Sequence, residues 1–492
     1  MEISVSTEAP ETVACDAVAL GVFADGGLQG AAGRLDEALG GLLSQALAEE
    51  RFDAKPGSTF VLHTHGRIPA KRIIAAGLGP RAAFEPDRLR QAAAATVRRA
   101  AELHAGHLAL TPIAIPPYPL PALTEARVEG AILGAYQFTR YKSRRGGEVG
   151  RLTLLAESAQ RRDVEAGIQR GRLFADATCF ARDIVNEPPN VVTPAYVAEV
   201  AEDVGRQTGL ETTILDEDAM RAQGMGAILA VGQGSALPPR LIRMEYAPPR
   251  PRKTVAIVGK GVTFDSGGLS LKKAEDMVTM KSDMAGGAAV LATMRALTAL
   301  APPVRVLGII PAVENLPSGQ ATKPGDIIRA LNGKTIEINN TDAEGRVILA
   351  DALSYAAQQV PDEIIDLATL TGSAMVAFGY LAAAVMGNDQ PLVSRLLDAA
   401  GAAGERMWQL PLYDEFLEEM RSLVADLKNS GGRYGGAEKG AVFLREFVDG
   451  RPWAHVDIAP VAFLDTKEGT GPYLPKGATG YGVRTLLTYL SG

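Results

Sequence analysis

Short apolar segments rich in valine and isoleucine alternate with helix-like segments through the second half of the chain, and this pattern restricts the fold most strongly. The apolar segments are KTVAIVGKG, VRVLGIIPA, KTIEINN and EIIDLATL, with DMAGGAAVLATMRALTAL and RVILADALSYAAQQ between them. Strands that are apolar on both faces are typical of parallel sheets covered by helices. The pattern therefore predicts an α/β fold with a central, mainly parallel sheet flanked by helices and functional side chains at the carboxyl ends of its strands.

Residues 1–160 show a second alternation of the same kind. The strand-like segments are ACDAVALGVFA, STFVLHTH, KRIIAAGLG, HLALTPI and VGRLTLLAES, and the helix-like ones are FEPDRLRQAAAATVRRAAELHAG and EARVEGAILGAYQFTRY. We expect the proline cluster PIAIPPYPLPAL to form a surface loop. A long helical segment then ends at NEPPN, because proline cannot continue a helix. We predict a smaller N-terminal α/β domain over 1–160, a connecting helix with its stop over 161–190, and a larger C-terminal catalytic domain over 191–492.

Charge and hydropathy limit the classes of protein to be considered. The 492 residues carry a net charge of −7, which disfavours a generally basic nucleic-acid-binding surface but leaves a local basic patch open. The first residues lack the basic and apolar regions of a secretory signal. The uncharged run 367–388 is long enough to span a membrane, but three glycines interrupt it, and we interpret it as a buried strand with a glycine-rich connection. We expect a cytoplasmic protein that does not associate with membranes.

The segment INNTDAEGRVILADAL places Asp342, Glu344 and Arg346 on every second residue, directly before an apolar, helix-like stretch. In an extended chain, side chains at this spacing point to the same side, so two carboxylates and a guanidinium would project together. The alternative is a charged loop before a helix whose N-terminus favours acidic residues. The position beside a predicted core helix favours a functional site.

Other charged residues follow the predicted strands of the same domain. Lys260 ends KTVAIVGKG, Asp265 and Lys272 follow in VTFDSGGLSLKK, and Asp283 precedes a helix in MKSDMAGG. Each could singly be a helix cap or part of a surface ion pair. Clustered carboxylates repel one another unless cations bind them, and metal ions that take oxygen ligands suit such a cluster. Since the sequence contains no HExxH motif, a thermolysin-like zinc site is excluded, and a carboxylate-rich site with two metals is favoured.

Several segments resemble those of the leucyl (cytosol) aminopeptidase family, which are two-metal exopeptidases. They are RDIVNEPPN, VGKGVTFDSGGLSLK, MKSDMAGGAAV, NTDAEGR, DLATLTG and VADLKNSGGRYGGA. They occur in the family's order and cover the chain from about residue 182 to its end. The N-terminal region resembles the family's more variable first domain only in its α/β pattern.

The resemblance implies two divalent metal ions per subunit, Mn²⁺ or Zn²⁺. Asp265 and Glu344 would bridge the two ions, Lys260 and Asp283 would complete one site, and Asp342 would complete the other with its carboxylate and main-chain oxygen. A lysine ligand must lose its proton, which a neighbouring dication makes feasible.

The resemblance also implies roles for residues that do not bind metal. Lys272 would stay charged and stabilise the oxyanion of the tetrahedral intermediate, and Arg346 would hold a bicarbonate that acts as the general base. The pocket for the substrate side chain would be formed by Met280, Thr369, Leu370, Gly372 and Ala459, although each could equally be a core position. Pro460 stands where the family commonly has glycine; this departure would make the rim of the pocket more rigid and so affect the side-chain preference.

The implied function is metal-dependent removal of N-terminal residues, preferably leucine and similar ones, from peptides with a free N-terminus, through attack by water activated by two metals. The resemblance further implies a homohexamer. The alternative is a nucleoprotein, DNA-binding or structural role of an aminopeptidase-like protein. The acidic balance disfavours this alternative without excluding nucleic acid, and gel retardation on DNA at physiological salt would test it.

Overall fold

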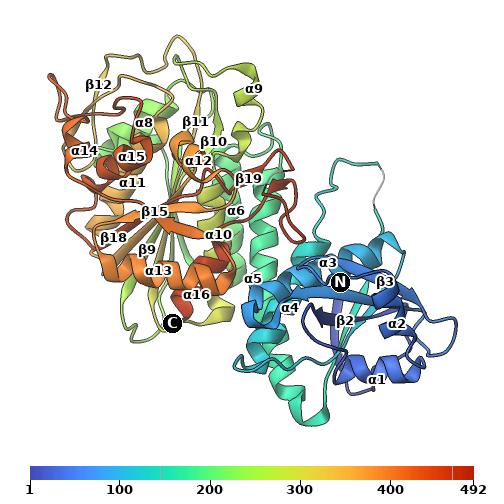
Figure 1. Ribbon diagram of the computed structural model, residues 1–492. Coiled ribbons are helices and arrows are strands. Elements are labelled where there is room, and N and C mark those ends of the chain that lie inside the picture. The colour runs from blue at the N-terminus through green and yellow to red at the C-terminus, as the bar shows by residue number, and fades with distance from the viewer. Residues whose placement is uncertain (144–145, 468) are drawn as a thin grey trace. The chain divides into compact units, whose positions relative to one another are not determined.

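The computed structural model describes residues 1–143, 146–467 and 469–492. The chain divides into two compact units, an N-terminal unit of Met1–Asp176 with Thr470–Pro475 and a C-terminal unit of Ala177–Gly469 with Lys476–Gly492 (Figure 1). The division falls within the long helix α5 (Arg161–Asn186). This helix ends two residues before Pro188, as the sequence predicted.

The N-terminal unit contains a six-stranded sheet in the order β1-β6-β5-β2-β4-β3. Its elements are β1 (Glu2–Ser6), β2 (Ala17–Phe23), α1 (Ala31–Ala38), α2 (Leu42–Glu49), β3 (Thr59–His63), β4 (Arg72–Gly79), α3 (Pro86–Glu102), β5 (His107–Leu110), α4 (Leu120–Ala135) and β6 (Arg151–Leu155), with short 3-10 turns at Arg81–Ala83 and Ser158–Gln160. All neighbouring strands pair in parallel except β3, which runs antiparallel to β4 at one edge. The chain moves from β2 to β4 on one side, then crosses through α3 to β5 on the other.

The C-terminal unit is built on a nine-stranded sheet in the order β16-β15-β18-β14-β9-β11-β8-β7, with β10 pairing with β11. Its elements are α6 (Pro194–Thr208), β7 (Glu211–Leu215), α7 (Glu217–Gln223), α8 (Gly226–Gly232), β8 (Arg240–Tyr246), β9 (Thr254–Gly259), β10 (Gly261–Asp265), α9 (Ala274–Met277), a 3-10 turn (Met280–Ser282), α10 (Ala285–Leu300), β11 (Arg305–Asn315), β12 (Ile327–Arg329), β13 (Thr335–Glu337), α11 (Glu344–Gln358), β14 (Glu363–Ala368), α12 (Gly372–Phe378), β15 (Ala383–Gly387), α13 (Gln390–Ala403), β16 (Met407–Gln409), α14 (Glu415–Glu418), β17 (Leu427–Lys428), α15 (Gly436–Arg445), β18 (Trp453–Asp457), β19 (Phe463–Leu464), β20 (Gly477–Ala478) and α16 (Val483–Ser491).

The middle of this sheet is parallel, which confirms the predicted fold class. The parallel pairs join β18, β14, β9 and β11 in the middle of the sheet. Among the described residues, antiparallel pairs in this sheet occur only toward its two edges. The segment 255–258 of β9 is fully buried between helices such as α10 and α11, whose buried residues are mostly alanine, valine, isoleucine and leucine. In Figure 1 these helices lie against the sheet.

One predicted sheet strand is wrong. KTIEINN contributes only β13, three residues that pair with β12 and β17 in a small separate sheet. Its alternating partly buried and buried side chains fit a surface ribbon better than a strand covered on both faces. The uncharged run 367–388 divides into the end of β14, α12 and β15, and no helix among the described residues has the length and apolarity needed to cross a membrane.

Candidate active site

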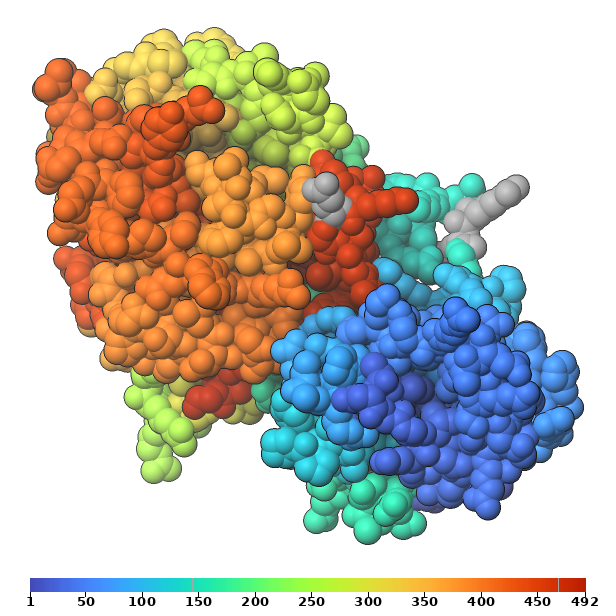
Figure 2. Space-filling view, in the orientation of Figure 1, coloured from blue at the N-terminus to red at the C-terminus, as the bar shows by residue number. Residues whose placement is uncertain are grey.

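A cleft of about 530 Å³ opens at the carboxyl ends of the central strands of the C-terminal unit. Its walls come from distant parts of the chain, and Figure 2 shows yellow-green and orange segments meeting on one face of this unit. All residues predicted for the site line this cleft, namely Lys260, Asp265, Lys272, Met280, Asp283, Asp342, Glu344, Arg346, Thr369, Leu370, Gly372 and Ala459. The parallel sheet brings them together because its strands end at the same edge.

The side chain of Lys260, directly after β9, lies at the centre of one half of the cluster. Its Nζ is 2.7 Å from an Asp283 carboxylate oxygen and 2.9 Å from Glu344 Oε1. The same Nζ donates a hydrogen bond of 3.0 Å to the main-chain oxygen of Thr369, and the Thr369 hydroxyl donates to Asp283 Oδ1 at 2.7 Å. Thr369 therefore fixes both partners from the end of β14.

Lys272 occupies the centre of the other half. Its Nζ is 2.8 Å from Asp265 Oδ2 and 2.5 Å from Asp342 Oδ1. Asp265 is the last residue of β10, and its Oδ1 accepts hydrogen bonds from the Gly267 amide and from Asn315 Nδ2, both at 2.8 Å. Asn315 ends β11 and was not predicted as a site residue, although a polar side chain at the end of an apolar strand is a signal that could have identified it.

The extended geometry predicted for Asp342, Glu344 and Arg346 is wrong. Helix α11 begins at Glu344, so Glu344 and Arg346 occupy its first turn while Asp342 lies in the loop before it. The three side chains still face the same cleft. The positive end of the helix dipole favours the Glu344 carboxylate at this position.

The donor set fits divalent cations. Asp265, Asp342 and Glu344 each offer a carboxylate oxygen, and these oxygens lie within 4.8 Å of one another. Glu344 Oε2 is buried and has no hydrogen-bond partner among the described residues. A buried carboxylate oxygen without a partner is costly, and a metal ion would satisfy it. Oxygen ligands at this spacing suit Mn²⁺, Zn²⁺ or Mg²⁺.

The ammonium groups of Lys260 and Lys272 offset part of the carboxylate charge. Burial alone would lower the pKa of Lys260 and Lys272, but the surrounding carboxylates outweigh it and raise both. Burial raises the pKa of Asp265 to about 6, with repulsion from Glu344 adding to it. Burial also raises the pKa of Asp283. A divalent cation would replace these protons, so metal binding should release protons and weaken in acid.

Arg346 is a buried cation that makes no direct ion pair with any described carboxylate. It is 8% exposed, its Nε has no hydrogen-bond partner, and no ion pair to it is found in the part of the chain that the structure describes. Burial lowers the pKa of its guanidinium, and the charges of Glu344 and Asp457 offset this effect only in part. A planar, charged guanidinium that faces a cleft and has no ion pair is suited to binding a small planar anion.

The residues expected to form the side-chain pocket lie along the loops after β14 and β18. Asp457, which was not predicted, holds these loops together. Its carboxylate accepts hydrogen bonds from the amides of Leu370 and Ala459 at 3.1 and 3.2 Å, and from the Thr371 hydroxyl at 2.7 Å. Met375, Tyr380 and Phe463 also line the cleft and were not predicted, because nothing in their local sequence distinguishes them from core residues.

Two models of protein-family domains match the chain. The catalytic domain of the cytosol aminopeptidase family matches residues 179–487, and the N-terminal domain of the same family matches residues 19–145. The chain belongs to the cytosol aminopeptidase family. It is therefore an aminopeptidase, a metal-dependent hydrolase that acts at the N-terminus of peptides, as the sequence motifs indicated.

Full-length relatives and solved structures agree with this family. Probable cytosol aminopeptidases from Geobacter sp. (strain M21) and Alkaliphilus oremlandii (strain OhILAs) are 44% and 43% identical to this aminopeptidase, over 100% and 99% of its chain and 99% and 98% of theirs. A mutant tomato leucine aminopeptidase superposes with a TM-score of 0.90 at 35% identity, covering 100% of this chain and 96% of that one. The bottromycin maturation enzyme BotP in complex with Mn superposes with a TM-score of 0.86 at 37% identity, covering 97% and 99%.

Proposed function

We propose that this aminopeptidase releases leucine and similar residues from peptides with a free N-terminus and uses two divalent cations, Mn²⁺ or Zn²⁺. The observation that carries the proposal is the convergence of carboxylate oxygens from Asp265, Asp342 and Glu344 within 4.8 Å. Asp265 and Glu344 would contact both cations, Lys260 and Asp283 would complete one site, and Asp342 would complete the other. When bound, the cations supply a water of lowered pKa and electrostatic stabilisation of the developing oxyanion.

Two cationic side chains of the cleft would act on the substrate and the proton. Lys272 would donate hydrogen bonds to the carbonyl oxygen of the scissile bond as negative charge develops on it. Its Nζ lies 2.8 Å from Asp265 and 2.5 Å from Asp342, so it is placed beside the proposed cations. Arg346 would hold a bicarbonate beside the attacking water, and its buried guanidinium without a protein partner supports this role.

The side-chain preference would be set by the wall between the loops after β14 and β18. Met280, Thr369, Leu370 and Ala459 are half-buried, and Gly372 is exposed at the start of α12. The hydroxyl of Thr369 is turned toward Asp283, so the residue presents little polarity to the substrate. An apolar wall with small residues favours leucine-like side chains over charged ones.

We also propose a homohexamer acting in the cytoplasm. Large apolar side chains of the C-terminal unit are more than half exposed, among them Val376, Leu381, Leu423 and Tyr434, and burial between subunits would remove them from water. The relatives' description as cytosol aminopeptidases supports the location. Sedimentation velocity of the purified protein tests the assembly, and a monomer at micromolar concentration would contradict it.

The enzymatic proposal is tested by hydrolysis of leucine p-nitroanilide with chelator-stripped protein, before and after addition of Mn²⁺ or Zn²⁺. We expect activity only with metal. N-acetyl-leucine p-nitroanilide is the matched control, because it keeps the side chain and the leaving group but lacks the free amine. Hydrolysis of the acetylated substrate at a similar rate would contradict the proposal. So would the absence of hydrolysis of the free-amine substrate by folded, metal-loaded protein.

A further inference from the structure

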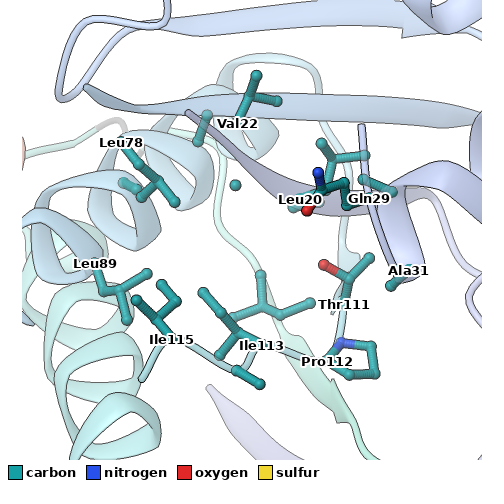
Figure 3. Close-up of a pocket in the computed structure, with 18 of the residues that line it drawn as sticks. Leu20, Val22, Gln29, Ala31, Leu78, Leu89, Thr111, Pro112, Ile113 and Ile115 are labelled. Atoms are coloured by element: carbon teal, nitrogen blue, oxygen red, sulfur yellow. The ribbon is translucent and has the colours of Figure 1, made fainter. Parts of the chain in front are cut away.

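The N-terminal unit contains a cavity of about 370 Å³ at the carboxyl ends of β2, β4 and β5. The chain runs from β2 through β3 to β4 on one side of β2 and then crosses through α3 to β5 on the other side, so this is the point where the strand order reverses. Such points are where open parallel sheets bind ligands. Figure 3 shows Leu78, Leu89, Ile113 and Ile115 facing the space beside the end of β2. The proline-rich segment predicted as a surface loop therefore forms part of a wall, and Ile115 in it is buried.

A buried cation without a counter-charge faces this cavity. Arg127 of α4 lines it and is 8% exposed, and the described residues provide it with neither a hydrogen bond nor an ion pair. Burial lowers the pKa of its guanidinium to about 10, and no carboxylate opposes that effect. The acids two positions away on the same helix point elsewhere, Glu125 toward Arg170 and Glu129 toward Arg90. An anion from outside the chain would stabilise a buried charge in this state.

Two loops add a second kind of anion-binding group. The glycine-rich loop after β2 leads into the N-terminus of α1, and the main-chain NH groups of residues 27–31 donate no hydrogen bond to any described residue. The same holds for residues 113–115 in the loop after β5. No acidic residue occupies the first turn of α1. Unoccupied amides in a glycine-rich loop before a helix are the usual means of binding phosphate oxygens.

The remaining charges around the cavity are at its rim. Arg34 and Arg81 line it with exposed side chains, and Glu157 is the one acidic residue among the described lining residues, also exposed. The inner walls are apolar and come from Leu20, Leu78, Leu89 and Leu110. The cavity therefore combines anion-binding groups with apolar walls.

We propose that this cavity binds a phosphate-bearing small molecule of nucleotide size, with the phosphate oxygens on the free loop amides and Arg127, and the base against the apolar walls. The volume is in the range of pockets that hold ligands of this size. A carboxylate alone would leave most of the loop amides without acceptors, whereas a diphosphate supplies several oxygens. The proposal concerns a site in the other unit of the chain and does not depend on the proposed peptidase chemistry.

Isothermal titration calorimetry of the full chain in phosphate-free buffer tests the site with ADP, inorganic pyrophosphate and adenosine as probes. We expect ADP to bind and adenosine to bind roughly tenfold more weakly or not at all, since charge-assisted hydrogen bonds contribute on that scale. Pyrophosphate reports the contribution of the phosphates without the base. Arg127→Met should weaken ADP binding by roughly tenfold or more.

Two further variants make the result decisive. Arg99→Met removes an exposed charge from α3, where Arg99 pairs with Glu102, and should bind ADP as the wild type does. If Arg127→Met fails to fold, Ile113→Asp places a negative charge on the half-buried loop position at the cavity and should also abolish ADP binding. Absence of binding of both ADP and pyrophosphate to the wild type, or ADP binding unchanged in Arg127→Met and Ile113→Asp, would overturn the proposal.

Discussion

Both units place a cavity at the carboxyl edge of a parallel sheet, but the two cavities have opposite charge requirements. In the C-terminal cleft, the carboxylates of Asp265, Asp283, Asp342 and Glu344 surround two lysines, so acidic groups are in excess. In the N-terminal cavity, a single buried arginine faces apolar walls and free main-chain amides. The carboxyl edge of a parallel sheet therefore carries an acidic cluster in one unit and a buried arginine beside apolar walls in the other.

This difference shows that the fold determines where a site lies, while the residues at the strand ends determine what it binds. Arg346 makes the comparison sharper, because it is an unpaired buried arginine within the acidic cleft, just as Arg127 is in the N-terminal cavity. If the buried charges determine which ligands bind, Arg127 and Arg346 should each bind an anion. Lys260 and Lys272 should contribute to activity only when metal ions are bound. The following substitutions separate these contributions.

The largest effect is expected for Lys272→Ala. Removing the ammonium group between Asp265 and Asp342 should lower kcat by roughly 10²–10³-fold, the range found for loss of one oxyanion-stabilising donor. The measurement is steady-state hydrolysis of leucine p-nitroanilide by metal-loaded protein, with circular dichroism as the check of folding. Lys323→Ala is the control, since Lys323 is an exposed lysine of the same unit that does not line the cleft. Equal losses in both variants would show that Lys272 has no special role.

A smaller loss is expected for Arg346→Met. If the buried guanidinium holds bicarbonate, kcat should fall by roughly ten- to hundredfold, the scale of charge-assisted hydrogen bonds. The wild-type rate should rise with added bicarbonate, and the rate of the variant should not. Arg346→Lys should recover little, because an ammonium cannot replace the planar fork. A bicarbonate response that persists in Arg346→Met would place the anion elsewhere.

The sequence predicted the acidic site better than the other cavity for a physical reason. Carboxylates and lysines that follow apolar strands stand out, because such residues are seldom buried without a function. The position of Asp283 before α10 or of Asp265 at the end of β10 could therefore be used without knowing the helix boundaries. The extended geometry assumed for TDAEGR was wrong, yet Asp342, Glu344 and Arg346 all line one cleft.

The N-terminal cavity could not be predicted in this way. Arg127 lies in a helix between two acids, where an arginine is ordinarily part of a solvated or ion-paired face. Its isolation depends on which way α4 is turned against α3, which only tertiary packing determines. The misassigned KTIEINN segment has the same cause, since a short β-prone run does not reveal whether a second layer covers it.

Arg127→Met should stabilise the protein in the absence of an anion. Replacing an unpaired buried cation by an apolar side chain of similar length should raise the free energy of unfolding by about 1–3 kcal/mol. Urea denaturation in phosphate-free buffer measures this change, with Arg99→Met as the control. Added pyrophosphate should stabilise the wild type and leave Arg127→Met unchanged. A destabilised Arg127→Met variant would instead indicate a structural role and would remove the parallel with Arg346.

The smallest effect on stability is expected at Glu125 of the N-terminal unit, which forms an ion pair with Arg170. Burial and repulsion from Glu129 raise the pKa of Glu125 to about 7, although Arg170 lies 3.1 Å away. Because the folded-state pKa exceeds the ordinary value, the protonated form favours folding. The contribution of Glu125 to stability is therefore full below about pH 4.5 and is lost as the pH rises through 7.

Glu125→Gln should remove this pH dependence and raise the unfolding free energy at pH 8 by about 1–2 kcal/mol, an amount discounted for its partial exposure. Urea denaturation at pH 5 and pH 8 gives the comparison, and Glu102→Gln on the exposed side of α3 is the control. A Glu125→Gln variant with the same pH dependence as the wild type would show that Arg170 and Arg90 fully compensate the acids of α4. In that case Arg127 would be the only described charge of α4 whose partner must come from outside the chain.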